Sequence, residues 1–560
     1  MTIADLSWWA WLAITVVAAL LLYRLVQRLQ LSLAKHPTLL GHSKMLRFFA
    51  KWVPNYDITE DQFYRCDSAP EHIVAKRRAG FSRLAAELAM SSPKSSQLSD
   101  SLESDVSDLK FTKRYRVPYQ FANYVSQHLA INTFVAKSAG TQLQDVDGNW
   151  SDDLSGAYGV NLFGYDFYKK CMQKAGWLVG ELGPVLGPYH PVIERNVQRL
   201  KAISGMDEVS FHMSGTEAVM QAVRLARYHT GKTRLVQFCG AYHGWWDGVQ
   251  PGLGNTRKTR DVYTLSEGSK QSLRVLASRD DIACVLINPL QALHLNRNAP
   301  SDSTLLLSRT NLRFDKQAYS NWLHDLRQVC TAKGIVMIID EVFVGFRLAK
   351  GGAQEFFDVR ADMVTYGKTL GGGFPVGVVC GRADLMRRYK TDQPTNVCFA
   401  RGTFNSHPHV LGAMDAFLTE LENPTSDLAR HYADLEPLWN DRAQALNERL
   451  EAANLPIRVA NMLSIWAITF PIPGRYHWLF QYYLKANGIT LGWVGTGKLI
   501  FSHNFSSADF ARVADKIISA AAQMADDGWF WQDASAKPIA LKMSLAKEFA
   551  SALLSRRAAR

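Results

Sequence analysis

The sequence predicts an α/β protein whose large domain is built on a mostly parallel, doubly wound sheet. From about residue 135, short continuous apolar runs alternate with amphipathic helical patterns. Runs that are apolar throughout indicate strands buried on both faces, as in a parallel sheet covered by helices. The clearest runs are RLVQFCG (234–240), ACVLINP (283–289), GIVMIIDEV (334–342) and DMVTYG (362–367). An uncharged N-terminal stretch adds an N-terminal transmembrane helix in front of this domain.

That stretch, Leu6–Tyr23, contains 18 residues without a charge. As an α-helix it is about 27 Å long, close to the ~30 Å of a bilayer's hydrocarbon core. Asp5 precedes it, and Arg24 and Arg28 follow it, which is the reverse of a signal peptide and places the rest of the chain in the cytoplasm. We therefore expect a single-pass anchor over residues 1–24, with a buried hydrophobic helix as the alternative.

Composition narrows the class of protein. Of the 560 residues, 47% are hydrophobic and 20% charged, so a large globular core is expected. The net charge of +12 is spread along the chain without zinc-finger spacing or an RNA-binding aromatic motif. We therefore expect no nucleic-acid partner and attribute the charge to a nearby membrane. Seven scattered cysteines without a C-x-x-C pair indicate a reducing compartment, and we expect no metal site.

The stretch VTYGKTLGGGFPVG (364–377) places one lysine, Lys368, between a buried strand and three glycines. A nucleotide-binding P-loop needs a glycine five residues before the G-K pair, and that position is Asp362. The second G-K-T, at 231–233, has Ala226 at the corresponding position, so an ATPase is excluded. Two interpretations of Lys368 remain: a surface lysine in a glycine-rich turn, or a nucleophile that bonds to the carbonyl of a cofactor.

Other short motifs bear on this choice. Ser214-Gly215-Thr216 opens a helix, so its N–H groups can bind an anion, although S-x-x-E is also an ordinary helix cap. Tyr242 and His243 follow a strand, where an aromatic ring can stack on a flat ligand or belong to the core.

Asp340 ends the very apolar strand at 334–342, at the edge where α/β sheets bind ligands. A protonated ring nitrogen would satisfy its buried charge; a metal-binding Asp-Glu pair is the alternative. Thr403, in RGTF, offers one more hydroxyl to a phosphate. Taken in order, the motifs describe a planar, phosphorylated aldehyde with a pyridine nitrogen, which is pyridoxal 5′-phosphate (PLP).

The sequence resembles class III aminotransferases of PLP fold type I. It is most similar to the branch that contains glutamate-1-semialdehyde aminomutase and the aminotransferase modules of polyketide/peptide synthetases. The resemblance covers about residues 111–530. It is carried by DVDGNW (145–150), GAYGVNLFG (156–164), SGTEAVMQAVRLAR (214–227), YHGWWDG (242–248), DEVFVGFR (340–347), the stretch at 351–381 and RGTFNSHP (401–408).

The resemblance implies two catalytic residues. Lys368 would bond covalently to PLP and carry the proton, and Asp340 would pair with the pyridinium nitrogen. The remaining implied cofactor contacts are Ser214, Gly215 and Thr216 at the phosphate, Tyr242 and Val342 on the two ring faces, His243 beside the ring, Gln291 at the ring hydroxyl, and Thr403 from the neighbouring subunit of an obligate homodimer.

Two departures from the family concern the substrate. Asn288 stands where many members have a glutamate that pairs with a switchable arginine, which suggests a different substrate. The stretch ALHLNRNAPSDSTLLLSRTNLRF (292–314) looks expanded and could shape the substrate entrance. The DVDG sequence lacks the third acidic ligand of a calcium loop and predicts a hairpin turn instead.

These observations predict a domain order. The expected segments are an anchor (1–24), a helical extension with a Ser-rich linker or long loop at Ser91–Ser107 (25–110), a first segment of the small domain (111–160), the large PLP-binding domain (161–410), a smaller C-terminal α/β domain (411–530) and a basic amphipathic tail (531–560). Helices between residues 24 and 90 either lie on an anionic membrane surface or pack against the body.

The expected function is that of a membrane-anchored PLP-dependent aminotransferase with its catalytic domain in the cytoplasm. Its carbonyl acceptor would be lipophilic or carrier-bound, such as an acyl-chain aldehyde or a β-keto thioester delivered by an acyl carrier protein, within a biosynthetic route. One alternative is an aminomutase of the glutamate-1-semialdehyde type, which needs no external amino donor. The other is a catalytically inactive PLP-fold scaffold.

Overall fold

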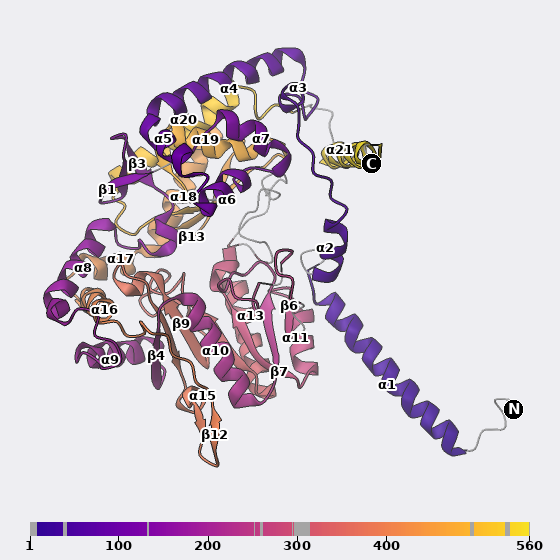
Figure 1. Cartoon of the computed structure of the whole chain (residues 1–560), viewed down its shortest axis with the longest axis vertical. Helices are drawn as coiled ribbons and strands as arrows, with labels where there is room; N and C mark the ends of the chain where they lie inside the picture. Colours follow the sequence, from indigo (N-terminus) through magenta and orange to yellow (C-terminus); the bar gives the residue numbers. More distant parts are fainter. Residues whose placement is uncertain are drawn as a thin grey trace.

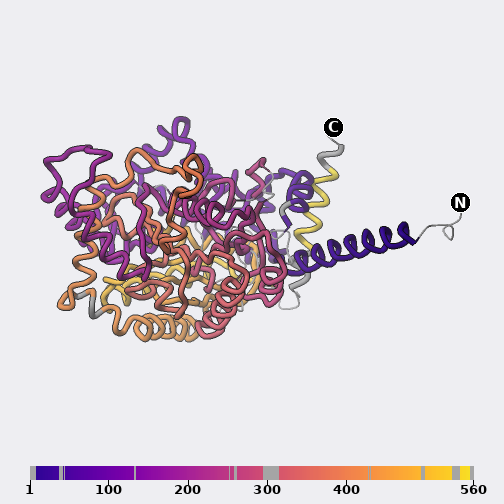
Figure 2. The backbone as a smooth tube through the Cα atoms, turned by 90° about the horizontal axis from the view of Figure 1, so that it is seen from below, coloured from indigo at the N-terminus to yellow at the C-terminus, as the bar shows by residue number. Residues whose placement is uncertain are grey.

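The computed structural model describes residues 8–36, 42–131, 134–250, 252–257, 261–293, 295, 314–492, 498–532 and 538–558. Among these, two sheet-centred units stack into an elongated body, and one long helix, α1, projects away from it (Figures 1 and 2). The expansion at 292–314, expected to shape the substrate entrance, lies almost wholly outside the described residues.

The larger unit is built on a seven-stranded sheet. In spatial order its strands are β4 (Glu208–His212), β10 (Gly377–Gly381), β9 (Met363–Gly367), β8 (Val336–Asp340), β7 (Ile282–Ile287), β5 (Arg234–Phe238) and β6 (Val262–Leu265). Strand β10 runs antiparallel to both neighbours, and the other neighbours pair in parallel. All four apolar runs singled out in the sequence form strands here, so the mostly parallel sheet is confirmed.

Both faces of this sheet are buried, because alternate residues of each strand point to opposite sides. Ile338 packs with α10 (Gly215–Thr230), whereas Met337 and Ile339 pack with α13 (Lys316–Lys333). The sheet is therefore covered by helices on both sides (Figure 1). Further helices of this unit are α8 (Tyr165–Val179), α9 (Val192–Ser204), α11 (Lys270–Ser278), α14 (Gly352–Phe356), α15 (Ala383–Met386) and α16 (Pro408–Glu422), and β11 (Tyr389–Lys390) pairs with β12 (Gln393–Val397).

The smaller unit joins segments from both ends of the chain. One sheet holds β1 (Val135–Ala139), β2 (Gln142–Asp145), β3 (Trp150–Asp153) and β15 (Ile489–Thr490), and β15 pairs in parallel with β3. A second sheet holds β13 (Arg458–Met462), β14 (Ile465–Thr469) and β16 (Lys498–Ile500). Their helices are α17 (Asp427–Ala433), α18 (Leu435–Ala452), α19 (Phe480–Ala486) and α20 (Ser507–Asp526). The DVDG sequence forms the predicted turn between β2 and β3.

The N-terminal extension is largely packed onto this smaller unit. Its helices are α2 (Ser43–Ala50), α3 (Glu60–Phe63), α4 (Glu71–Ser91), α5 (Pro93–Leu102), α6 (Ser107–Tyr115) and α7 (Tyr119–His128). The buried guanidinium of Arg77 in α4 pairs with Asp67 at 2.6 Å and lies over the ring of Tyr476, 4.6 Å from its centroid. Of the two expectations for residues 24–90, packing against the body holds for α4.

The expected Ser-rich linker is wrong for most of its length, because Pro93–Leu102 forms helix α5. Asp147, from the turn between β2 and β3, accepts hydrogen bonds from the backbone N–H groups of Lys94 and Ser95 at 2.7 and 3.0 Å. Ser95 and Ser99 are buried against the body. A carboxylate from a distant turn supplies the N-terminal cap, and local composition cannot show that.

Helix α1 (Trp8–Leu33) is exposed along its length and is, among the described residues, the one helix long and apolar enough to cross a membrane. It continues past the expected end at residue 24, because the first helix-breaking residue after Leu33 in the sequence is Pro37. Residues 1–7 lie outside the described part. The residue just after it contacts the larger unit, because the carbonyl of Ala34 accepts a hydrogen bond from Ser266 N–H at 2.7 Å.

The C-terminal segment also packs against the body. Residues Pro538–Ala558 form α21, which confirms the predicted helix, but its apolar residues are not gathered on one face, so the amphipathic character expected for 531–560 is wrong. Glu548 of α21 pairs with the buried guanidinium of Arg475 at 2.6 Å and accepts a hydrogen bond from Tyr56 at 3.3 Å. The helix therefore joins the extension to the smaller unit.

Candidate active site

The carboxyl ends of the central strands surround one cavity of about 420 Å³, which we call the Lys368 cavity. Lys368 follows β9, and Asp340 is the last residue of β8. Eight of the ten residues expected at a PLP site line this cavity, namely Ser214, Gly215, Thr216, Tyr242, His243, Asp340, Val342 and Lys368. Parallel strands present their carboxyl ends at one edge, so separate motifs meet there.

Asp340 is buried, and three groups contact its carboxylate. Its Oδ1 accepts hydrogen bonds from the Thr365 hydroxyl and the Val342 N–H, each at 3.1 Å. Its Oδ2 lies 2.8 Å from Nδ1 of the buried His243. Fixed in this way, the carboxylate keeps lone pairs that can accept a further proton donor in the cavity.

Lys368 begins a short 3₁₀ turn, η6 (Lys368–Gly371), with a backbone φ of 49°. A positive φ is uncommon for a residue with a side chain and often marks a functional position. Burial lowers the pKa of its ammonium, and the negative charge of Asp340 acts in the opposite direction. A lysine with a lowered pKa has more of the neutral amine that attacks carbonyl groups.

The N-terminus of α10 supplies the third part of the site. The Ser214 hydroxyl caps the helix by accepting from Glu217 N–H at 3.2 Å. The first turn of an α-helix presents N–H groups without intrahelical partners, and its positive end favours an anion. Glycine is required beside it, because a Cβ on Gly215 would lie 2.5 Å from Val342 and one on Gly244 would lie 2.5 Å from the Thr216 hydroxyl.

Two of the expected residues, Gln291 and Thr403, lie outside the described lining of the Lys368 cavity. Gln291 is buried and donates to the carbonyl of Gly240 at 2.8 Å, while its Oε1 has no hydrogen-bond partner among the described residues. Thr403 is exposed in a turn, and its expected role belongs to a neighbouring subunit. Both roles stay predictions.

Three residues of this site were not expected from the sequence: Thr365 donates a hydrogen bond to Asp340, and Phe343 and Val160 line the cavity. Asn288, expected to bear on the substrate, donates to the carbonyl of Tyr242 at 2.9 Å. One signal was available: Thr365 is a polar residue inside an otherwise apolar run, and it pairs with Asp340 across β8 and β9.

Comparison with known proteins decides the family. The family described as "Aminotransferase class-III" matches residues 124–294 and 315–520. The chain belongs to the class III aminotransferases. A glutamate-1-semialdehyde 2,1-aminomutase of Methanocaldococcus jannaschii is 31% identical over 374 residues, which cover 64% of this chain and 78% of that protein. The enzyme of the same name from Hyperthermus butylicus is 34% identical over 301 residues, covering 52% of this chain and 67% of the other.

Solved structures agree on the fold. A transaminase with PLP bound shares 25% identity, with a TM-score of 0.58 over 71% of this chain and 92% of the other. A β-phenylalanine aminotransferase from Variovorax paradoxus shares 21% identity, with a TM-score of 0.64 over 82% of this chain and 100% of the other. The protein is thus a PLP-dependent class III aminotransferase of fold type I.

The residues present fit PLP. The capped N-terminus of α10 suits a phosphate, the buried carboxylate of Asp340 suits a protonated ring nitrogen, and the amine of Lys368 suits an aldehyde. All three lie on one cavity of about 420 Å³, a size typical of small-molecule sites. The glycines at 215 and 244 leave the space that a Cβ would fill.

Proposed function

We propose that this enzyme is a membrane-anchored aminotransferase that moves an amino group from a donor to a lipophilic or carrier-bound carbonyl acceptor. The observation that supports it most is the single cavity that joins Lys368, Asp340 and the N-terminus of α10. Asn288, at the position of the family's frequent glutamate, donates to the Tyr242 carbonyl rather than offering a carboxylate to the cavity. This favours an acceptor that differs from the dicarboxylic substrates of many relatives.

Each residue of the cavity has a role in this proposal. PLP, when bound, supplies an electron sink that stabilises negative charge on the substrate carbon next to nitrogen. The Nζ of Lys368 takes the proton from that carbon and returns it during amino transfer. Asp340, fixed by Thr365 and His243, keeps a proton on the ring nitrogen.

The other expected contacts hold the cofactor in place. Ser214, Gly215 and Thr216 would bind its phosphate at the start of α10, and Tyr242 and Val342, which line the same cavity, would pack against its ring. We further propose a homodimer in which Thr403 of each subunit reaches the phosphate of the other. The exposure of Thr403 in this chain is compatible with that arrangement.

Absorbance spectroscopy of the purified holoprotein tests the proposed reaction. Titration with candidate amino donors should shift the cofactor band, and a carbonyl acceptor should restore it. A protein that interconverts its substrate without any donor would instead be an aminomutase, the second candidate, which the names of its 31–34% identical relatives favour. If no amine changed the cofactor band, the catalytically inactive PLP-fold scaffold would be the remaining candidate.

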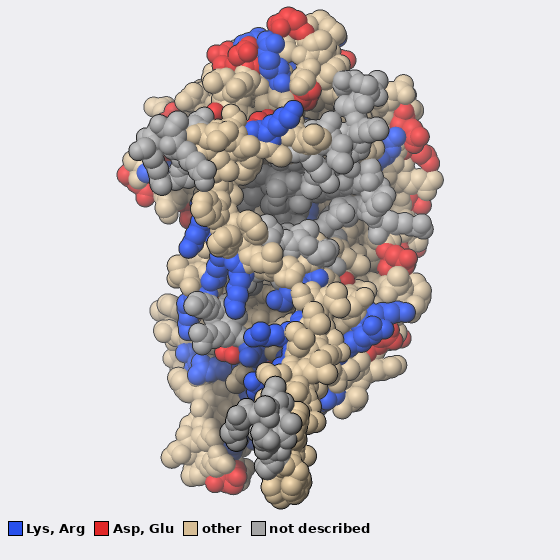
Figure 3. Space-filling model, turned by 90° about the vertical axis from the view of Figure 1, so that its right-hand side faces the viewer, with Lys and Arg blue, Asp and Glu red and all other residues tan. Residues whose placement is uncertain are grey.

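Membrane anchoring rests on α1. Its 26 residues span about 39 Å, enough to cross a bilayer with some tilt. Lys and Arg side chains gather on the face of the body from which α1 projects (Figure 3), as expected for a surface beside anionic lipids. In α2, Phe48 and Phe49 are 59% and 47% exposed, and Trp52, just after the helix, is 56% exposed, which suits an interfacial segment next to the anchor.

Cell fractionation tests this part. The full chain should stay with membranes after an alkaline carbonate wash, and protease added to intact spheroplasts should leave the catalytic body uncut. A fully soluble protein in detergent-free lysate contradicts the anchor, and cleavage of the body from outside contradicts its cytoplasmic orientation.

A further inference from the structure

Helix α2 (Ser43–Ala50) follows α1 where the chain reaches the body (Figure 1), and it presents an apolar face to solvent. The exposed apolar side chains are those of Met45, Phe48, Phe49 and Trp52. Their spacing of i, i+3, i+4 and i+7 places them on one side of the helix, because helical backbone continues through Lys51. An exposed apolar face of this kind marks a surface that binds a partner or a membrane.

The surroundings of this face favour lipid as the partner. Leu29 and Leu33 are exposed in the last turns of α1, so apolar side chains reach the end of the helix that is long enough to cross a membrane. Lys44 and Lys51, both exposed and seven residues apart, follow one edge of the apolar face of α2. Aromatic rings with lysines beside them suit the boundary between the acyl chains and the anionic headgroups of a bilayer.

The other side of α2 is bonded to a loop of the larger unit, residues 252–257, which we call the Asn255 loop. One guanidinium nitrogen of Arg47 lies 2.6 Å from the carbonyl oxygen of Asn255 and 3.2 Å from that of Arg257. The same nitrogen lies 3.5 Å from the carbonyl oxygen of Gly252. A single side chain of α2 therefore contacts three carbonyls of one short loop, and it holds the loop at a fixed position relative to the helix.

The Asn255 loop is bonded in turn to the segment that precedes it. The side-chain amide of Asn255 donates to the carbonyls of Asp247 and Gln250 at 3.3 and 3.2 Å. The guanidinium of Arg257 pairs with the carboxylate of Asp247 at 3.2 Å. Both Asn255 and Arg257 thus connect Arg47 to Asp247.

Asp247 lies close to the Lys368 cavity along the chain. It comes three residues after Gly244, and Tyr242, His243 and Gly244 all line the cavity. His243 also contacts the carboxylate of Asp340 at 2.8 Å. A short, continuous set of contacts therefore joins α2 to the groups expected around the cofactor ring.

We propose that an anionic lipid surface binds the apolar face of α2 and, through Arg47, orders the Asn255 loop and raises the activity of the Lys368 cavity. Because Arg47 and the apolar face lie on different sides of α2, the helix can contact lipid and the loop at the same time. Lipid stabilises the arrangement in which both contacts are made, and this difference in binding shifts the loop towards its ordered state. The inference rests on the proposed anchoring and adds a regulator to the proposed function.

Photocrosslinking identifies what covers the apolar face. Full-length, PLP-loaded protein with p-benzoylphenylalanine in place of Phe48 is illuminated in nanodiscs, and the crosslinked mass is measured. We expect a lipid adduct, whereas the same probe in place of the exposed Met90 of α4 should give none. A crosslink from position 48 to a second copy of the chain, or none to lipid, overturns the proposal.

Hydrogen–deuterium exchange measures the coupling. Nanodiscs that contain anionic lipid should slow amide exchange in the Asn255 loop by about 5-fold or more compared with zwitterionic nanodiscs, the effect expected for one lysine beside an anionic surface. Arg47→Met should abolish this difference, while its position-48 probe still crosslinks to lipid. Arg114→Met removes an exposed arginine of α6 and should behave as the wild type.

A double variant tests the lipid side without touching the loop. Lys44→Gln/Lys51→Gln leaves Arg47 in place and should lose most of the dependence on anionic lipid. The rate at which an amino donor changes the cofactor band should follow loop exchange in every variant. Near-wild-type thermal unfolding temperatures identify the variants that are folded and suitable for comparison.

The outcomes separate this inference from the proposed function. A folded Arg47→Met variant that keeps the full lipid dependence of loop exchange overturns the coupling, even if amino transfer is intact. An equal loss in Arg114→Met also overturns it, because the effect would then be one of general charge. Lipid-dependent ordering of the loop in a protein whose cofactor band no donor changes supports the coupling and overturns the proposed amino transfer.

Discussion

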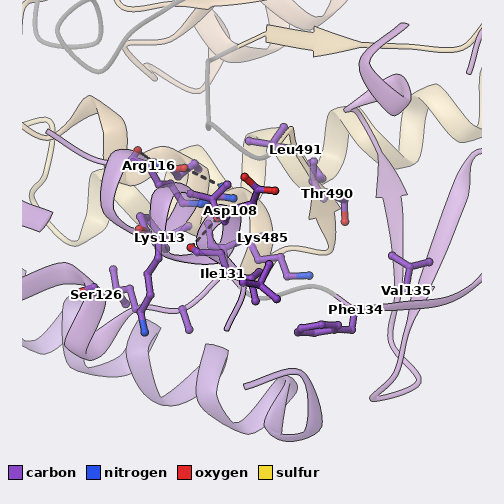
Figure 4. Close-up of a pocket in the computed structure, with 18 of the residues that line it drawn as sticks. Asp108, Lys113, Arg116, Ser126, Ile131, Phe134, Val135, Lys485, Thr490 and Leu491 are labelled. Atoms are coloured by element: carbon purple, nitrogen blue, oxygen red, sulfur yellow. Dashed lines mark hydrogen bonds between the residues drawn. The ribbon is translucent and has the colours of Figure 1, made fainter. Parts of the chain in front are cut away.

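Two cavities of the molecule are assembled in different ways. The Lys368 cavity is made by consecutive motifs at the ends of strands in one sheet, within the region that matches the family. A second cavity of about 470 Å³, which we call the Lys485 cavity, is made by segments near residues 106–135 and 481–491, and its helix α6 precedes the family match (Figure 4). The cavity that contains Lys368 therefore lies in the part of the chain shared with the family, whereas the second cavity is built partly from the extension that precedes it.

Each cavity contains a lysine whose pKa is lowered by burial, but the neighbouring charges differ. The lowering of the Lys368 pKa is opposed by the negative charge of Asp340, a carboxylate inside the same cavity. The lowering of the Lys485 pKa is opposed by the charges of Asp145 in β2 and Asp147 in the turn that follows, and the charge of Arg116 adds to it. Burial alone therefore does not mark a nucleophile, and Lys368 differs from Lys485 in sharing its cavity with Asp340 and the N-terminus of α10.

The largest expected effect separates these two lysines. Lys368→Ala should abolish covalent retention of PLP and lower amino transfer by roughly 10²–10⁴-fold, the range for loss of a general acid–base group. Borohydride reduction followed by mass spectrometry measures the covalent retention. Lys485→Met should keep PLP attached and react with the amino donor normally, and exposed Lys201→Ala serves as the control. PLP found on another lysine of the wild type would contradict the assignment.

A smaller effect is expected at the carboxylates. Asp340→Asn removes the charge that holds the ring nitrogen protonated while preserving side-chain shape, so kcat should fall about 10- to 100-fold. The acceptor KM should change little. Asp108→Asn, in the Lys485 cavity, should leave kcat unchanged. Steady-state kinetics at several pH values gives both parameters, and an equal kcat for Asp340→Asn and the wild type would remove Asp340 from the mechanism.

Features encoded by neighbouring residues could be predicted from the sequence. The buried strands follow from continuous apolar runs, and Lys368, Asp340 and Ser214 follow from their places at strand ends and a helix start. Contacts between segments that are distant in the chain could not be predicted in this way. Helix α5 was missed because its cap, Asp147, comes from another part of the chain, and the Lys485 cavity was missed because its lining residues form no local pattern.

The junction at the end of α1 has a mechanical consequence. The Ala34 carbonyl accepts from Ser266 N–H at 2.7 Å, and the Gln27 carbonyl accepts from Arg279 at 3.3 Å. These hydrogen bonds fix the end of α1 against the larger unit, so the junction does not act as a flexible linker. Under the proposed anchoring, these bonds would hold the body at one tilt and height above the lipid plane, so substrates at that height would meet the enzyme in one orientation.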